Sequence, residues 1–205
     1  MSTSETENTR LFDALPAVDV EANARLHARL VAAAERDGLL DVAYRTLATP
    51  VGELLLATTE RGLIRIAFPI QGHDAVLESL AEIVSPRILR APQRLDPVSR
   101  QLDEYFGGRR TEFDLPLDFR LASGFRRTVL AHLPAIPYGH TESYAQVAAA
   151  SGSPKAVRAV GTACAKNPLP VVVPCHRVVR SDGTAGGYAG GPDAKRTLLD
   201  LEAAA

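Results

Sequence analysis

Sulfur-containing residues and tryptophan are scarce in this 205-residue chain, which has two cysteines, one methionine and no tryptophan. Two cysteines are too few for a disulfide scaffold or a four-cysteine zinc site. The sequence also lacks any stretch close to the roughly 20 apolar residues of a membrane-spanning helix. Its first residues lack the basic and then apolar pattern of a secretory signal. We therefore expect a cytoplasmic globular protein with reduced thiols and no membrane partner.

Neither sign of charge dominates, because the formal net charge is −1. The distribution is uneven, however: residues 1–120 carry a net charge of −5 and residues 121–205 a net charge of +4. A polyanionic partner is therefore expected to bind the C-terminal half. An excess of four charges also occurs in domains with uncharged partners, so charge alone leaves nucleic-acid binding open.

The hydrophobic pattern divides the chain into three parts, at residues 1–40, 41–118 and 119–205. The first is a leader that is polar and aperiodic up to residue 19, followed by one helix expected over 21–37. The second has the strand-like runs, glycine-containing hairpin loop and helical stretches of a small α+β domain. Its expected strands cover 42–46, 54–58, 63–68 and 111–117, and its expected helices cover 73–84 and 96–106.

The third part is mostly helical, and its motifs resemble a DNA-binding unit. Ser143 and Gln146 form a capping box that predicts the start of a short helix. Ser153 is expected to cap the next helix, with Pro154 in its first turn. Two short helices joined by a glycine turn have the outline of a helix-turn-helix. Further helices are expected over residues 124–133 and 193–203. Because any two packed helices joined by a glycine turn share this outline, the motif alone does not establish DNA binding.

Cys175 is the candidate reactive residue, because it follows Pro174 between two valine-rich runs. The proline restricts the residue before it to extended geometry, so the thiol is expected at a fixed turn. Neighbouring His176 and Arg177 would raise the ionised fraction of a thiol if their side chains reached it. A nucleophilic thiolate, a metal ligand pair and a buried structural turn all fit this segment, although the metal reading lacks further ligands. Cys164, on an alanine- and valine-rich helix, is expected to be an ordinary buried residue.

A glycine-rich segment at residues 181–191 follows the cysteine within a few residues. Such loops often only connect elements, but the lack of Cβ atoms also allows a flat ligand to come close. Tyr188, in the middle of the loop, could stack on a planar base.

These motifs, in this order, resemble the O6-alkylguanine-DNA alkyltransferases, also called methylated-DNA–protein-cysteine methyltransferases. The resemblance is carried by residues 138–139, 143–144, 153–161, 167–168, 174–179 and 187–191 and by the pair Lys195 and Glu202. It implies an α+β fold in which a ribonuclease-H-like N-terminal domain precedes a mostly helical domain. It also implies direct-reversal DNA repair, in which an O6-alkylguanine is flipped out of the duplex and its alkyl group is transferred irreversibly to Cys175.

The family resemblance implies a role for each residue around the cysteine. His176 would activate the thiol through a water molecule, and Glu202 would orient the histidine. Asn167 would brace the turn, and Lys195 would favour the thiolate. We expect this sulfur to be ionised and reachable at the mouth of a pocket shaped for the flipped purine. The further residues expected to line that pocket are Val178, Tyr188, Ala189 and Gly190.

The resemblance also implies that the helix-turn-helix enters the minor groove of double-stranded DNA. Arg158 would fill the space left by the flipped nucleotide, and Tyr144 would crowd the adjacent phosphate and donate to guanine N3. The other expected contacts to DNA come from Ser153, Lys155, Ala156, Ala159 and Gly161.

The protein is expected to act once per molecule, without a cofactor or metal ion, as a monomer, and cooperative binding to DNA stays open. Two alternatives stay open at this point. One is an alkyltransferase-like protein that binds lesions without chemistry, and the other is a helix-turn-helix regulator.

Overall fold

A computed structural model of the chain describes residues 19–204, which fall into two compact units separated after Leu39. The described part of the first unit consists mainly of helix α2 (Val20–Arg36), which confirms the helix expected there. Asp19 caps α2 by accepting a hydrogen bond from the backbone of Ala22 at 3.0 Å. The aperiodic leader expected before this helix lies outside the described residues, except for Asp19. Within residues 19–204, no helix combines the length and the apolar character needed to cross a membrane.

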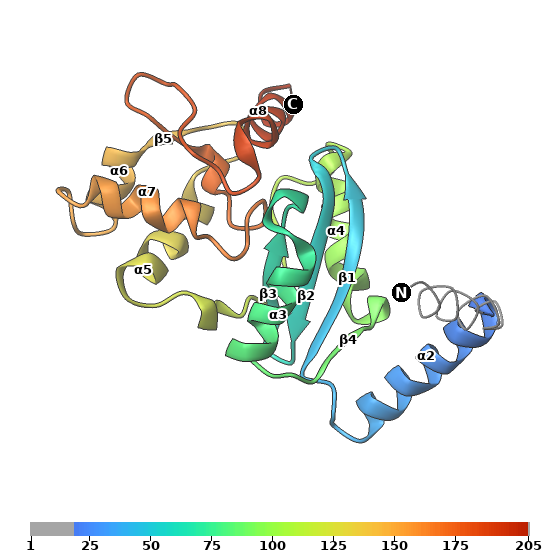
Figure 1. The fold of residues 1–205 in the computed structure, drawn as a ribbon. Coiled ribbons are helices and arrows are strands. Elements are labelled where there is room, and N and C mark those ends of the chain that lie inside the picture. Colours follow the sequence, from blue (N-terminus) through green and yellow to red (C-terminus); the bar gives the residue numbers. More distant parts are fainter. Residues whose placement is uncertain (1–18, 205) are drawn as a thin grey trace, which may run out of the picture. The chain divides into compact units, whose positions relative to one another are not determined.

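The second unit begins with a four-stranded sheet in the order β3-β2-β1-β4 (Figure 1). β1 (Val42–Thr49), β2 (Gly52–Thr59) and β3 (Gly62–Ala67) form an antiparallel meander, which confirms the strands expected at 42–46, 54–58 and 63–68. β4 (Ile88–Arg90) pairs with β1 in parallel. This three-residue strand is too short to give a hydrophobic period, and the sequence did not predict it.

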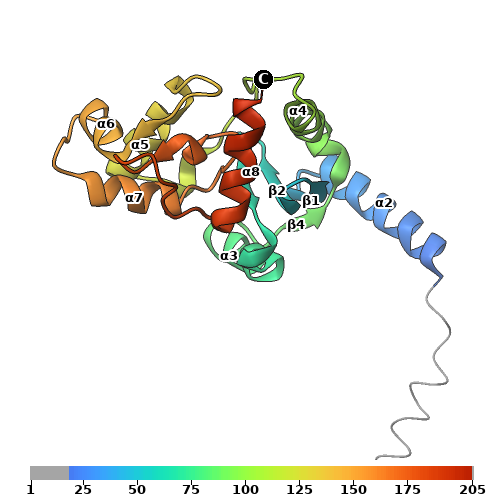
Figure 2. The same ribbon diagram turned by 90° about the horizontal axis from the view of Figure 1, so that it is seen from above.

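Two helices cover opposite faces of this sheet (Figures 1 and 2). On one face, α3 (His73–Ile83) buries Val76 and Leu80 against Leu55, Ala57 and neighbouring apolar residues of the strands. On the other face, α4 (Asp96–Phe106) contributes Val98, Leu102 and Tyr105, and it ends at Gly107 as expected. This arrangement forms the small α+β domain that the sequence predicts.

The segment 111–117 is not a strand, contrary to the expectation from its sequence. Only Leu117 forms a bridge to the sheet, with Leu63. The backbone N–H and C=O of Asp114 are instead bonded to the side-chain amide of Gln101, at 2.9 and 2.8 Å. Because Pro116 has no N–H to donate, the segment cannot continue a ladder of backbone hydrogen bonds.

The remaining residues form the helical domain (Figure 1). Its helices are α5 (Gly124–His132), α6 (Tyr144–Ala150), α7 (Val157–Ala165) and α8 (Gly191–Ala203). A two-residue parallel ladder joins β5 (Glu142–Ser143) to β6 (Val178–Val179), which ties the start of α6 to the segment after Cys175.

The capping box at the start of α6 is present, but the expected cap of α7 is not. Ser143 Oγ accepts from the backbone of Gln146 at 3.2 Å, and the Gln146 side chain accepts from the Ser143 backbone at 2.7 Å. α7 begins only at Val157, with Ala156 at the cap position. Ser153 instead closes a turn through its carbonyl, which accepts from the backbone of Ala156 at 2.8 Å. Pro154 lies in this turn, before the helix starts.

Candidate active site

The turn that carries the candidate cysteine is held by the side chain of Asn167. Its Nδ2 donates to the carbonyl of Val173 at 2.8 Å and to Cys175 Sγ at 3.1 Å. Its Oδ1 accepts from the backbone of Leu169 at 3.0 Å. A single buried amide therefore joins both ends of the turn to the sulfur.

The same turn contains an unusual backbone conformation at Val171, whose φ is +73°. Among the residues that the structure describes, every other residue with a positive φ is a glycine. A β-branched residue is strained in this region, so the surrounding packing must hold it there. Val171 is 1% exposed, and the backbone of Val173 donates to Leu169 O at 2.8 Å across the turn. The thiol therefore lies on a tightly fixed segment.

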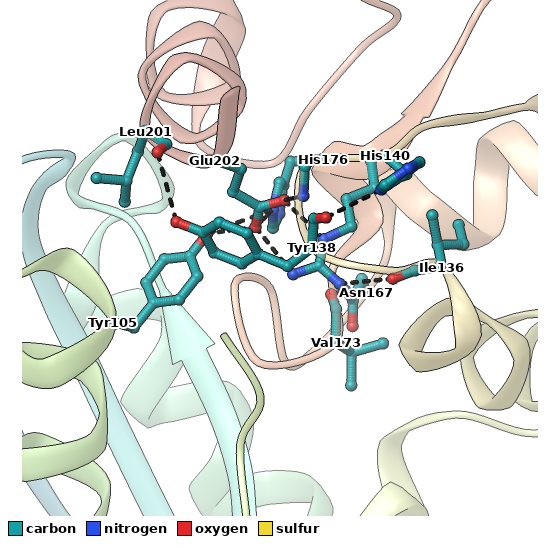
Figure 3. Close-up of polar contacts among 11 residues, drawn as sticks. Tyr105, Ile136, Tyr138, His140, Asn167, Val173, His176, Leu201 and Glu202 are labelled. Atoms are coloured by element: carbon teal, nitrogen blue, oxygen red, sulfur yellow. Dashed lines mark hydrogen bonds and ion pairs between the residues drawn. The ribbon is translucent and has the colours of Figure 1, made fainter. Parts of the chain in front are cut away.

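The carboxylate of Glu202, on α8, is the centre of a buried hydrogen-bond network (Figure 3). Its Oε1 accepts from Tyr105 Oη at 2.7 Å and lies 2.9 Å from His176 Nε2. Arg177 donates to both carboxylate oxygens, from Nε at 2.8 Å and from Nη2 at 2.9 Å. The backbone N–H of Gly139 also donates to Oε2, at 3.2 Å. Burial alone would raise the pKa of Glu202, but the hydrogen bonds from His176 and Arg177 outweigh it and lower the pKa to about 2.

The ionised carboxylate determines which nitrogen of His176 carries the proton. Since Glu202 is an acceptor only, Nε2 must be protonated to form the 2.9 Å hydrogen bond. Burial lowers the pKa of His176 despite the opposing effect of the carboxylate, so the ring is neutral and Nδ1 is unprotonated. Nδ1 is buried and has no hydrogen-bond partner in the part of the chain that the structure describes. The arrangement leaves one free basic nitrogen in the residue next to Cys175.

The thiol of Cys175 is neither ionised nor reachable in this structure, contrary to what we expected. The residue is 1% exposed. Burial raises the pKa of the thiol to about 11, although the Asn167 amide and the charge of Lys195 act in the opposite direction. The expectation failed mainly because burial outweighs the favourable groups, and also because Arg177, adjacent in sequence, pairs with Glu202 and not with the sulfur. Cys164 is also buried, at 2% exposure, as expected for a structural cysteine.

Lys195 and Tyr144 lie together beside this centre. Lys195 is completely buried and donates from Nζ to the carbonyl of Val178 at 2.6 Å. Its Nζ lies 5.9 Å from the centre of the Tyr144 ring. Burial lowers the pKa of Lys195, and the opposing effect of the nearby cysteines does not cancel this shift. The ammonium group is therefore held by a backbone carbonyl close enough to Cys175 to act on the thiol electrostatically.

The glycine-rich segment packs its aromatic residue inward. The Tyr188 ring makes edge contacts with Phe68, at 5.5 Å between centroids, and with His176, at 6.3 Å. A Cβ atom at Gly190 would lie 2.6 Å from the Phe68 ring, so only glycine fits there. Val178 is buried, and Ala189 is half-buried in the same loop. Tyr188 therefore occupies the space beside His176.

The helix pair α6 and α7 presents an open face of small residues. Lys155, Arg158 and Ala159 are exposed. Ser153, Ala156 and Gly161 are half-buried. The two helices are joined through Gly152, whose φ of +77° favours glycine. The residues expected to contact DNA therefore lie on one continuous stretch of chain with its basic side chains in solvent.

The structure adds Tyr105 and Arg177 to the residues around the candidate centre. Tyr105 lies on α4 of the N-terminal domain, far from Glu202 in sequence, so no local pattern could have connected them. Arg177 belongs to the cysteine motif, and its pairing with a distant carboxylate became visible only in the fold. Among residues 19–204, no group of three or more His, Cys, Asp or Glu side chains is placed to hold a metal ion.

Two family descriptions match successive parts of the chain. The 6-O-methylguanine DNA methyltransferase ribonuclease-like domain matches residues 42–119, and the DNA binding domain of the same family matches residues 124–204. The chain belongs to the 6-O-methylguanine-DNA methyltransferase family. This confirms the resemblance and the fold class expected from the sequence.

Relatives in this family align over most of their length. A methylated-DNA–protein-cysteine methyltransferase of Mycolicibacterium paratuberculosis is 41% identical over 161 residues, which are 78% of this chain and 92% of the relative. The constitutive enzyme of Bacillus subtilis is 42% identical over 160 residues, covering 78% of this chain and 94% of the relative. A crystal structure of Mycobacterium tuberculosis OGT in complex with DNA matches with a TM-score of 0.68 at 38% identity. It covers 79% of this chain and 93% of that one.

Proposed function

We propose that this protein repairs alkylated DNA by transferring the alkyl group of an O6-alkylguanine to Cys175. The observation that carries this proposal is the buried series Cys175, His176 and Glu202, in which the carboxylate fixes the histidine and leaves Nδ1 free. The names of the family relatives, which are methylated-DNA–protein-cysteine methyltransferases, support the same activity. Double-stranded DNA is the partner that the DNA binding domain of the family implies.

The open face of α6 and α7 is the part that would enter the minor groove. Small side chains such as Ala156 and Ala159 allow close approach to the groove walls. Arg158 is exposed and has the length to fill the space of a rotated nucleotide. Lys155 would contact a phosphate, and Tyr144 would lie at the edge of the base pocket. Flipping costs a few kcal/mol, and less where alkylation has weakened the base pair, which favours the damaged base.

Activation of the thiol would use the free nitrogen of His176. With a pKa of about 11, the thiol is almost entirely protonated at neutral pH in the free protein. Its proton would pass through a water molecule to His176 Nδ1 as the reaction proceeds. The positive charge that then forms on the imidazole is stabilised by Glu202. Lys195 lies where its charge lowers the energy of the thiolate.

The transfer itself is a displacement at the alkyl carbon. Sulfur forms a bond to this carbon while the bond from the carbon to guanine O6 breaks, and the electron pair of the broken bond stays with the guanine. Hydrogen-bond donors such as Tyr144 Oη would stabilise the negative charge that develops on the purine. The products are an S-alkyl cysteine and, after protonation, an unmodified guanine. Because a thioether is not reversed by thiol exchange, each molecule reacts once, and the reaction needs no cofactor.

The buried thiol requires that the site open before reaction. Tyr188 lies next to His176, within a segment rich in glycine, and the neighbouring residues 181–185 are exposed. Displacement of this segment would give the flipped base access to Cys175, Val178 and the backbone of Ala189. We therefore propose that the flipped base enters the site by replacing the contacts that Tyr188 makes. The protein would act as a monomer.

The experiment is intact-mass spectrometry after incubation with a duplex that contains O6-methylguanine. We expect the wild type to gain one methyl group per molecule and Cys175→Ser to gain none. Cys164→Ser is the matched control, because it removes the other buried thiol and should still be methylated. Binding to the damaged duplex without a mass increase would favour a lesion-binding protein. Protection of a specific undamaged sequence would favour a regulator.

A further inference from the structure

A cavity of about 490 Å³ lies within the second unit, between its α+β domain and its helical domain. Its walls come from β3, α3, the start of α5 and the segment that follows α7, which can be located in Figure 1. Cys175, His176 and Glu202 are not among its lining residues, although Asn167 is. We call it the Arg65 cavity, after the arginine that β3 contributes to it. Its volume is in the range of small-molecule sites, about 300–1,000 Å³.

The charged side chains of the Arg65 cavity are all basic. Arg65, Arg126 and Lys166 line it, and none of its described lining residues is an aspartate or glutamate. Gln71 and Ser79 add polar groups that can donate hydrogen bonds. Three cations around one concave space create a positive potential that favours an anion.

Arg65 is placed where an unpaired charge is costly. It lies opposite Ala57 in the sheet, on the face that α3 covers with apolar residues. Its Nε is buried without a hydrogen-bond partner, and no hydrogen bond or ion pair of its guanidinium is found among the described residues. Burial lowers the pKa of Arg65, but arginine keeps its charge in proteins. A partly buried cation without a counter-ion is destabilising unless a ligand supplies the opposite charge.

Arg126 has the same unused capacity. Its Nη2 donates to the carbonyl of Leu121, but its Nε is buried without a hydrogen-bond partner among the described residues. Arg45 has the more usual arrangement for a partly buried arginine. Its Nε is also unpaired, but its charge is balanced by Asp96, which lies 2.9 Å from Nη1. Neither Arg65 nor Arg126 has such a carboxylate partner within residues 19–204, and both line the same cavity.

We propose that the Arg65 cavity is an anion site that binds the phosphate group of a small molecule. Guanidinium groups donate in a planar fork that matches two phosphate oxygens, and two of them can bind one phosphate from different sides. Lys166 adds a third charge at the open edge, where it is exposed. The partly enclosed space admits a small phosphate compound more readily than a duplex. Since both domains line the cavity, a bound phosphate would join them and stabilise the fold.

The test is thermal unfolding and calorimetric titration of the full chain with inorganic phosphate and with pyrophosphate. Sodium chloride at the same ionic strength serves as the reference. We expect a rise in Tm that saturates with phosphate and is absent with chloride. Arg65→Gln and Arg126→Gln should each weaken the Kd for phosphate by about 10-fold, as expected for loss of a charge-assisted hydrogen bond. Arg127→Gln is the matched control, because Arg127 is the exposed neighbour of Arg126 and does not line the cavity.

Three results would overturn the proposal. The first is an equal rise in Tm with chloride, and the second is an unchanged Kd in the Arg65→Gln, Arg126→Gln double variant. The third is a lack of binding by both phosphates. If Arg65→Gln then also weakens the binding of undamaged duplex DNA, the cavity is part of the DNA interface. If Arg65→Gln does not fold, Lys166→Gln provides the same comparison from an exposed position, with an expected loss of about 3-fold in affinity.

Discussion

Replacement of Glu202 by glutamine removes the negative charge from the centre of the buried network and keeps its shape. In the wild type, the pKa of this carboxyl group falls from 4.5 to about 2 on folding. That shift corresponds to about 3 kcal/mol of stability at neutral pH. The loss of one partner from a buried ion pair gives a similar figure, about 3–5 kcal/mol, because Arg177 is left without its counter-ion. We therefore expect Glu202→Gln to lower the free energy of unfolding by about 3 kcal/mol at pH 7.

The pH dependence gives the sharper test of this reasoning. Because the pKa of Glu202 is lower in the folded state, its contribution is complete above pH 4.5 and is lost as the pH falls toward 2. The stability difference between the wild type and Glu202→Gln should therefore shrink as the pH falls from 7 to 3. Other carboxyl groups with lowered pKa, such as Asp41, titrate in both proteins and cancel in the difference. Urea unfolding of both proteins at several pH values measures this difference in the free energy of unfolding.

Tyr105→Phe is the matched control for this prediction. It removes one hydrogen bond to Glu202 Oε1 but leaves the carboxylate, His176 and Arg177 in place. Its stability should fall by about 1–3 kcal/mol, and the acid-dependent part of the stability should remain. A difference between the wild type and Glu202→Gln that stays constant between pH 7 and 3 would refute the assignment of an ionised, hydrogen-bonded Glu202.

Three further substitutions test the turn, the DNA face and the capping box. Asn167→Ala leaves the buried backbone N–H of Leu169 unpaired and removes one of the two hydrogen bonds to the carbonyl of Val173, which still accepts from the backbone of Cys175. Chemical denaturation should therefore show a loss of about 2–4 kcal/mol. A change within about 0.5 kcal/mol, the size of an ordinary surface effect, would contradict the bracing role. Arg158→Ala should slow transfer from duplex DNA and spare transfer from free O6-benzylguanine, as measured by single-turnover kinetics. Equal losses on both substrates would rule out its role in flipping. Ser143→Ala removes the cap of α6 and should cost about 1 kcal/mol, or a Tm decrease of about 2–4 °C, and an unchanged Tm would show that β5 already fixes this helix start.

Local sequence signals predicted most of the fold. Caps and glycines correctly indicate where α6 begins, at Ser143, and where α4 ends, at Gly107, whereas α7 begins at Val157 and not after the expected cap Ser153. The meander of β1 to β3 follows from apolar runs of strand-forming residues and a glycine-containing hairpin loop between the second and third runs. The expected strand at 111–117 was wrong because the backbone of Asp114 bonds to Gln101, a side chain on α4. Such a competition between partners distant in sequence leaves no local signal.

The sequence named the residues that lie around Cys175, but it did not predict the protonation state of the thiol. The motif identified Cys175, His176, Asn167 and Glu202, and the structure brings these residues into one connected region. The sequence also suggested that the cations next to Cys175 would ionise it. Adjacency in sequence does not determine the direction of a side chain, and Arg177 binds Glu202. Burial, which raises the thiol pKa, depends on the packing of the whole domain.

The burial of Cys175 also bears on the fate of the protein after it has reacted. The sulfur lies in a residue that is only 1% exposed, on a turn held by Asn167 and by the strained backbone at Val171. A methyl group added there must displace packed atoms, and the thioether can no longer donate a proton. Forcing an extra carbon into a well-packed interior costs about 1–3 kcal/mol. The alkylated protein should therefore be less stable than the unreacted protein and more susceptible to proteolysis.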